Sequence, residues 1–138
     1  MSEIILKQLA PRGHLRAAIN MSNFLLVTGK EANGDPQGVS PDMAKALAHE
    51  LDVDIEFILF SRPGELADAV FEDKWDIGNI ANEPERAKSI NFSFPYTLIE
   101  STFLVRKHLN FNTIKDIDNE GIRIAVAESC LLYTSPSP

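Results

Sequence analysis

Two spacings of apolar residues divide the chain into strands and helices. Met43, Leu47 and Leu51 recur every four residues, which is typical of one apolar face of a helix. A second stripe of this kind predicts a helix over residues 61–73. Apolar runs typical of strands lie at residues 14–20, 53–60 and 75–80. Strands that alternate with helices in this way predict an α/β fold with a parallel sheet flanked by helices.

The pattern outside these elements is weaker. It predicts a short helix or a loose arm at residues 1–12, an exposed hairpin or loop at 29–38, a strand at 98–106, a short helix or turn at 112–119 and a further strand at 122–127. The strand at 122–127 begins a new βα unit. Nothing after it completes that unit.

Two short segments have the residues that start helices. Ser40 and Pro41 form one, and Glu83 and Pro84 form the other; proline suits the first helical position because its missing N–H has no helical partner there. This predicts Ser40 and Glu83 as N-caps and places Arg86 on a first helical turn. Free N–H groups and a guanidinium together favour a small carboxylate. The alternative is a plain strand-to-helix connection with Arg86 as a solvated surface charge.

Charge and composition exclude several classes of function. The net charge is −7 and the 13 basic residues are scattered, so we expect no binding to DNA or other nucleic acid. No apolar run approaches the roughly 20 residues of a membrane span. The first residues do not form a signal peptide, so the chain taken literally would stay in the cytoplasm.

The residues that usually carry catalysis are few and separated. His14, His49 and His108 lie far apart and lack the spacing of metal ligands. Cys130 is the single cysteine, which excludes an internal disulfide and makes a poor candidate nucleophile. We therefore expect no metal, no cofactor, no catalytic residue and no enzymatic activity.

A ligand of a parallel sheet lies beyond the carboxyl ends of the strands. Three segments follow the strands at that edge, and they are residues 20–23, 60–62 and 79–82. They contain the amide side chains of Asn20, Asn23, Asn79 and Asn82. These side chains suggest a polar ligand.

Several of these segments resemble one known family. The sequences Glu83-Pro84-Glu85-Arg86 and Ile90-Asn91-Phe92-Ser93-Phe94-Pro95-Tyr96 are similar to a motif of family 3 of the bacterial extracytoplasmic solute-binding proteins. Weaker similarities extend over about residues 14–130. The resemblance implies the type II periplasmic-binding-protein fold, a periplasmic or other extracytoplasmic location, and delivery of a polar amino acid to the permease of an ABC transporter.

The resemblance also implies roles for individual residues. Arg86 would bind the α-carboxylate of a small-molecule ligand, and Asn20 would lie at a pocket position. Asn23 stands where many members carry an aromatic platform. Asn79 and Asn82 fall where members offer backbone and hydroxyl groups to an amino acid. The chain departs from the family pattern in a shorter segment before Arg86, which has Ala81, Asn82 and Glu83 where members carry threonine and serine residues. A glutamate is also a poorer N-cap than threonine.

The resemblance further divides the chain. We expect an N-terminal arm at residues 1–13, the first solute-binding lobe at 14–107, the truncated start of a second lobe at 108–130 and a non-native tail at 131–138. Such a fragment is expected to bind its ligand in the millimolar range or not at all. The alternative functions are a periplasmic dehydratase-like enzyme, for which Glu83 is the candidate acid, a ligand-sensing domain of a receptor, and an inactive product.

Overall fold

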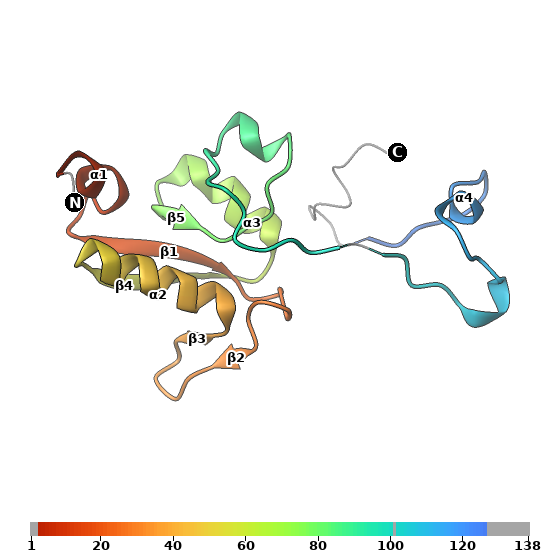
Figure 1. Ribbon diagram of the computed structural model, residues 1–138, viewed down its shortest axis with the longest axis horizontal. Coiled ribbons are helices and arrows are strands. Elements are labelled where there is room, and N and C mark those ends of the chain that lie inside the picture. Colours follow the sequence, from red (N-terminus) through yellow and green to blue (C-terminus); the bar gives the residue numbers. More distant parts are fainter. Residues whose placement is uncertain (1–2, 101, 127–138) are drawn as a thin grey trace.

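A three-stranded parallel sheet with helices on both faces forms the body of the molecule (Figure 1). The computed structural model describes residues 3–100 and 102–126. Its helices and strands in chain order are α1 (Glu3–Leu9), β1 (His14–Asn20), β2 (Gly29–Lys30), β3 (Pro36–Gln37), α2 (Val39–Leu51), β4 (Asp54–Phe60), α3 (Pro63–Asp68), β5 (Ile77–Gly78) and α4 (Ile114–Ile117). Three short 3-10 helices are η1 (Ala69–Glu72), η2 (Arg86–Lys88) and η3 (Lys107–Leu109). The predicted α/β fold is confirmed.

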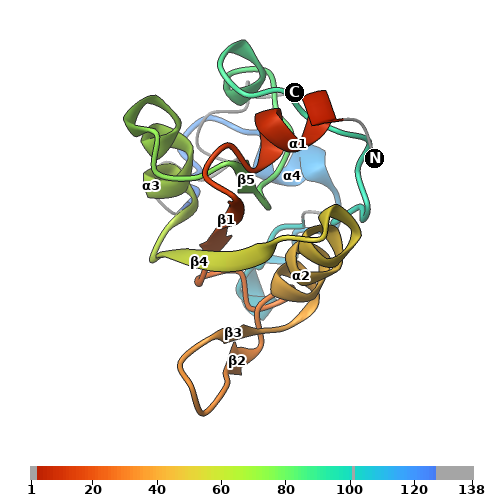
Figure 2. The ribbon, with the colours of Figure 1, turned by 90° about the vertical axis from the view of Figure 1, so that its left-hand side faces the viewer.

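The first strand occupies the centre of the sheet. The strand order is β4-β1-β5, and both pairings are parallel. The chain crosses from β1 to β4 through α2, and then in the opposite direction from β4 to β5 through α3. Because parallel crossovers are right-handed, this reversal places the two helices on opposite faces of the sheet. Figure 2 shows α2 on one side of the strands and α3 on the other.

The core forms where α2 and α1 cover one face of the sheet. Leu15, Ala48 and Leu51 are buried at its centre. Partly buried residues surround them, namely Leu6, Leu9, Leu47, Val53, Ile55 and Ile77. Of the stripe predicted for α2, Leu51 is buried and Leu47 partly buried, but Met43 is 43% exposed. The covered face of α2 includes Ala44 and Ala48 instead. Residues 3–9 form the helix that was one of the two predicted alternatives for the N-terminal segment.

The third strand is shorter than its sequence predicts. Only two residues, Ile77 and Gly78, pair with β1, although the prediction extended over residues 75–80. A Cβ atom added to Gly78 would lie 3.2 Å from a methyl carbon of Leu66 and 3.6 Å from the ring of Trp75. The indole Nε1 of Trp75 donates a hydrogen bond to the carbonyl of Leu66 at 3.0 Å. Gly78 thus allows α3 and Trp75 to pack closely on β5.

The predicted N-cap of the first long helix is wrong. Helix α2 begins at Val39, so that Ser40 lies inside the first turn and donates its N–H to the carbonyl of Leu26 at 3.0 Å. Gly38 occupies the cap position with φ of 127°, a conformation that L-residues rarely adopt. The hairpin of β2 and β3 immediately precedes it, as predicted for residues 29–38. The chain can turn sharply from the hairpin into the helix because Gly38 has no side chain.

The segment after the sheet forms no strand in its described part. The predicted strand at 98–106 is wrong for residues 98–100 and 102–106, and that at 122–127 is wrong for residues 122–126. Residues 101 and 127 lie outside the described part, as do Cys130 and the predicted tail at 131–138. Leu98 is 86% exposed, and Figure 1 shows this segment running away from the sheet. Strand propensity reflects packing against neighbouring strands, and the segment has none in the described residues.

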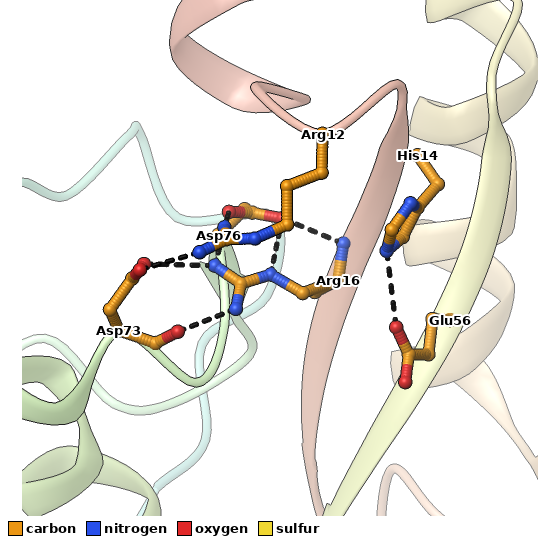
Figure 3. Close-up of polar contacts among 6 residues, drawn as sticks. All are labelled: Arg12, His14, Arg16, Glu56, Asp73 and Asp76. Carbon is orange, nitrogen blue, oxygen red and sulfur yellow. Dashed lines mark hydrogen bonds and ion pairs between the residues drawn. The ribbon is translucent and has the colours of Figure 1, made fainter.

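A charged network fastens β5 to β1 at the amino end of the sheet (Figure 3). The guanidinium of Arg16 donates to both carboxylate oxygens of Asp76, at 3.1 and 2.8 Å, and the backbone N–H of Arg16 donates to the same group at 2.9 Å. Arg16 also binds the carbonyl and the carboxylate of Asp73. Arg12 adds an ion pair to Asp73 at 2.5 Å. The Arg16 and Asp76 side chains are only 10% and 5% exposed.

This network makes the stability of the protein sensitive to acid. Burial of Asp76 opposes its ionisation, but the hydrogen bonds from Arg16 outweigh burial and hold the pKa of Asp76 below its ordinary value. The ionised Asp76 therefore contributes its full stabilisation above about pH 5. This contribution is lost as the pH falls below about 3.9, the pKa of an aspartate in the unfolded chain, toward the lower pKa of the folded state. We expect the difference in unfolding free energy between the wild type and Asp76→Asn to shrink between pH 5 and pH 3. Urea titrations across this range measure it, and a constant difference would contradict the assignment.

Candidate functional site

The carboxyl edge of the sheet gathers polar groups from two adjacent strands. Strand β1 ends at Asn20, whose partner in the parallel register is Phe60 at the end of β4. Strand β5 ends at Gly78 and is followed directly by Asn79. Because these parallel strands end at one edge, the structure brings Asn20 and Asn79 to the same edge of the sheet, as predicted.

Asn20 shapes the turn that follows β1. Its side-chain oxygen accepts hydrogen bonds from the backbone N–H of Ser22 at 3.1 Å and from the Ser22 hydroxyl at 2.8 Å. Asn20 is 9% exposed. Its Nδ2 group has no hydrogen-bond partner among the described residues. No side-chain nitrogen or oxygen in that part of the chain is both fully buried and unpaired, so this Nδ2 group still contacts solvent. The amide therefore offers donors at this edge.

Asn23 belongs to the same turn through its backbone. Its N–H donates to the carbonyl of Asn20 at 3.2 Å, and its own carbonyl accepts from the N–H of Val27 at 2.8 Å. The side chain of Asn23 is partly exposed. Phe24, which is 80% exposed, is the adjacent aromatic residue. The structure thus places Asn23 close in sequence and space to Asn20, while its role toward a ligand stays a prediction.

Asn79 ties the end of β5 to the start of α2. Its Nδ2 donates to the carbonyl of Ser40 at 2.7 Å, and its backbone N–H donates to the carbonyl of Ala18 at 3.4 Å. The side-chain amide N–H of Asn79, a residue predicted to bind the ligand, therefore already donates within the protein. The Oδ1 atom of Asn79 makes no hydrogen bond to a described residue and is an available acceptor.

Arg86 lies beyond β5 with a side chain that is mostly covered. The side chain is 8% exposed, and its Nη1 donates to the carbonyl of Ala81 at 3.2 Å. The nearest carboxylate oxygen, from Glu83, lies 3.6 Å from Nε, which is an ion-pair distance too long for a hydrogen bond. A guanidinium has five N–H donors, and only one makes a hydrogen bond within the described residues. Arg86 is therefore a partly satisfied cation, in contrast to Arg16.

Glu83 caps the turn that carries Arg86, although no α-helix follows. One carboxylate oxygen accepts the backbone N–H of Glu85 at 3.1 Å and the other accepts that of Arg86 at 3.0 Å. The segment continues only as the 3-10 helix η2, so Pro84 lies in a turn and not at a first helical position. The N-cap position of η2 is Glu85, so the predicted N-cap at Glu83 is wrong, although the Glu83 carboxylate still accepts two backbone N–H groups of this turn. The predicted helix is reduced to one turn. The Glu83 side chain is 5% exposed.

Asn82 lies on the surface, whereas Arg86 lines a groove. Asn82 is exposed and makes no hydrogen bond with a described residue. Arg86 and Glu83 line an open groove of about 250 Å³ between α3 and η2. Its other walls are formed by Gly64, Ala67, Asp68, Val70, Phe71, Glu85, Ser89 and Ile90.

Sequence reasoning missed two parts of this edge. The Ser22 hydroxyl and the Ser40 carbonyl fix Asn20 and Asn79, respectively, and neither group was singled out. An asparagine followed two residues later by serine is a known signal for a side-chain turn, and it would have found Ser22. A contact between residues 39 positions apart has no local signal. In residues 3–100 and 102–126 no group of three histidine, cysteine, aspartate or glutamate side chains is arranged to hold a metal ion.

The sequence and the structure were compared with those of known proteins. The sequence profile of the bacterial extracellular solute-binding proteins, family 3, matches residues 16–128. No curated protein sequence matches the chain significantly. Within the described residues, every helix is too short or too polar to cross a membrane.

Three solved structures are similar over 67% of this chain, each with a TM-score of 0.57. They are an ancestral cationic amino acid solute-binding protein at 34% identity, an ancestral amino acid-binding protein described as a precursor of cyclohexadienyl dehydratase at 33%, and an ancestral cyclohexadienyl dehydratase at 31%. The matched region covers 41%, 41% and 38% of those proteins, so the similarity extends over about two-fifths of their length.

Proposed function

The chain belongs to family 3 of the bacterial extracellular solute-binding proteins, and from this membership we propose that it binds a small polar carboxylate, such as an amino acid, at the carboxyl edge of its sheet. The observation that carries the proposal is Arg86, a mostly covered guanidinium with one hydrogen bond. A carboxylate can take up the remaining donors in a charge-assisted pair. The names of two similar structures, which describe amino acid-binding proteins, support this ligand class.

Two other polar groups lie at this edge, outside the residues that line the groove beside Arg86. The free Nδ2 donors of Asn20 suit a carboxylate, and the free Oδ1 acceptor of Asn79 suits an ammonium group. In the whole protein we propose that the ligand lies in a cleft between two lobes, which close over it by a hinge motion. We further propose an extracytoplasmic location and delivery of the ligand to an ABC transporter permease.

We propose a binding function in preference to catalysis. One similar structure is named a dehydratase, and an enzyme of that kind needs an acid poised over its ligand. Glu83 is the candidate acid in this chain, yet each of its oxygens accepts a backbone N–H. A carboxylate that is occupied as a cap is poorly suited to transfer a proton to a ligand.

The Arg86→Gln variant tests the proposed function. We expect the unmodified chain to bind amino acids with a dissociation constant in the millimolar range, equivalent to about −4 kcal/mol. The variant should lose about tenfold or more in affinity, because a charge-assisted hydrogen bond contributes roughly 1.5–3 kcal/mol. Titration of ¹⁵N-labelled protein by NMR measures affinities in this range.

The matched control is Arg106→Gln, which removes an exposed arginine from the segment beyond the sheet. Its affinity should stay within twofold of the wild type. Equal losses in the two variants would indicate a general effect of charge. Unchanged binding in Arg86→Gln would contradict the proposal.

A further inference from the structure

Glu83 and Arg86 form a buried pair in which the carboxylate performs two tasks. Both oxygens of Glu83 cap backbone N–H groups, and one of them lies 3.6 Å from Nε of Arg86. The two side chains are 5% and 8% exposed, so water screens the interaction between their charges only weakly. A ligand that approaches Arg86 therefore meets a negative charge beside the positive one.

Capping alone does not require this charge. Serine, threonine and asparagine cap helical turns with a neutral oxygen, and they do so at least as well as a glutamate. A neutral cap would leave Arg86 as an uncompensated cation that attracts any anion. Capping therefore does not explain the negative charge of Glu83. That charge acts on a ligand that approaches Arg86.

We propose that Glu83 sets the charge selectivity of Arg86, so that the site takes carboxylates balanced by their own positive charge and rejects ligands with a net negative charge. This inference rests on the proposed function, in which Arg86 binds the ligand carboxylate. Zwitterionic and cationic amino acids carry an ammonium group that offsets repulsion from Glu83. An acidic amino acid brings a second carboxylate with no such compensation, and like charges in a poorly screened site disfavour it.

The test compares three amino acids as probes, which are L-alanine, L-arginine and L-glutamate, in NMR titrations of the full chain. In the wild type we expect L-alanine and L-arginine to bind at least about tenfold more tightly than L-glutamate. In Glu83→Gln, which keeps a capping oxygen and removes the charge, the preference against L-glutamate should fall by about tenfold. Glu83→Thr, which caps through a hydroxyl, should give the same change.

Glu72→Gln is the control for net charge. Glu72 is an exposed residue that forms an ion pair with Lys74, and its loss should leave the selectivity ratio within twofold of the wild type. If the probes shift the Arg86 signals but neither Glu83 variant changes the ratio, the inference is overturned and the proposed function stands. If no probe shifts the Arg86 signals in any variant, both are overturned. A wild type that prefers L-glutamate would also overturn the inference, without any variant.

Discussion

Removal of the Asp76 side chain is expected to destabilise the protein by about 3 kcal/mol or more. In Asp76→Ala the guanidinium of Arg16 would lose its buried partner and keep only the exposed carboxylate and the carbonyl of Asp73, and removing one member of a buried ion pair is costly. The change also removes an acceptor from the Arg16 N–H at the point where β5 joins the sheet. Urea unfolding followed by circular dichroism measures the loss of stability.

A neighbouring aspartate provides the control for this prediction. Asp73 also binds Arg16, but its side chain is 74% exposed, so Asp73→Ala should cost well under half as much as Asp76→Ala. Replacing both members of the buried pair, as in Arg16→Met with Asp76→Leu, should recover part of the stability because no charge is then buried. Equal losses in the two single variants would show that burial is not the cause.

Substitution of Gly38 by alanine is the second change with a large expected effect. The added Cβ would lie 2.5 Å from the carbonyl oxygen of Leu26 and 3.0 Å from the N–H nitrogen of Thr28. Both atoms belong to the backbone, so the loop and the first turn of α2 must move apart. The φ of 127° adds strain of order 1–3 kcal/mol for a residue with a side chain. We expect a total loss of about 3 kcal/mol, measured by thermal or urea unfolding.

Gly34→Ala separates the contribution of the clash from that of the backbone conformation. Gly34 also has a positive φ, of 94°, but no atom lies within 4 Å of an added Cβ. It should therefore show only the conformational cost, about 1 kcal/mol. If Gly34→Ala were as destabilising as Gly38→Ala, the close approach to Leu26 would have no role in the effect.

Sequence patterns predicted the strands and helices that pack their apolar residues on the central sheet. Strand β4 begins one residue after its predicted start, and α2 covers the core with Leu51 and, in part, Leu47 of its predicted stripe, while Met43 is exposed. Residues 98–106 have an equally strong strand pattern, but the described part forms none. A helix satisfies its backbone internally, whereas a strand needs a neighbour that the pattern cannot identify.

The candidate site was predictable in position but not in hydrogen bonding. Asn20 and Asn79 follow from the rule that parallel strands end at one edge. Asn79 donates its side-chain N–H to the Ser40 carbonyl through a contact between the end of β5 and α2, and no local sequence pattern indicates that contact. Glu83 was predicted as a cap from its place before proline, and its spacing of three residues from Arg86 is that of neighbours on a helical turn. Only the covering of both side chains required the three-dimensional structure.

The central position of β1 has a consequence for how the chain folds during synthesis. The residues of β1 pair with partners 40 positions later in β4, as in His14 with Asp54, and 60 positions later in β5, as in Ala17 with Ile77. A ribosome adds about 5–20 residues each second, so this apolar strand waits roughly 2–8 seconds for its first partner. During that interval its backbone groups are unpaired and its side chains uncovered. The nascent chain is therefore most exposed to aggregation, and most in need of a chaperone, before β4 leaves the ribosome.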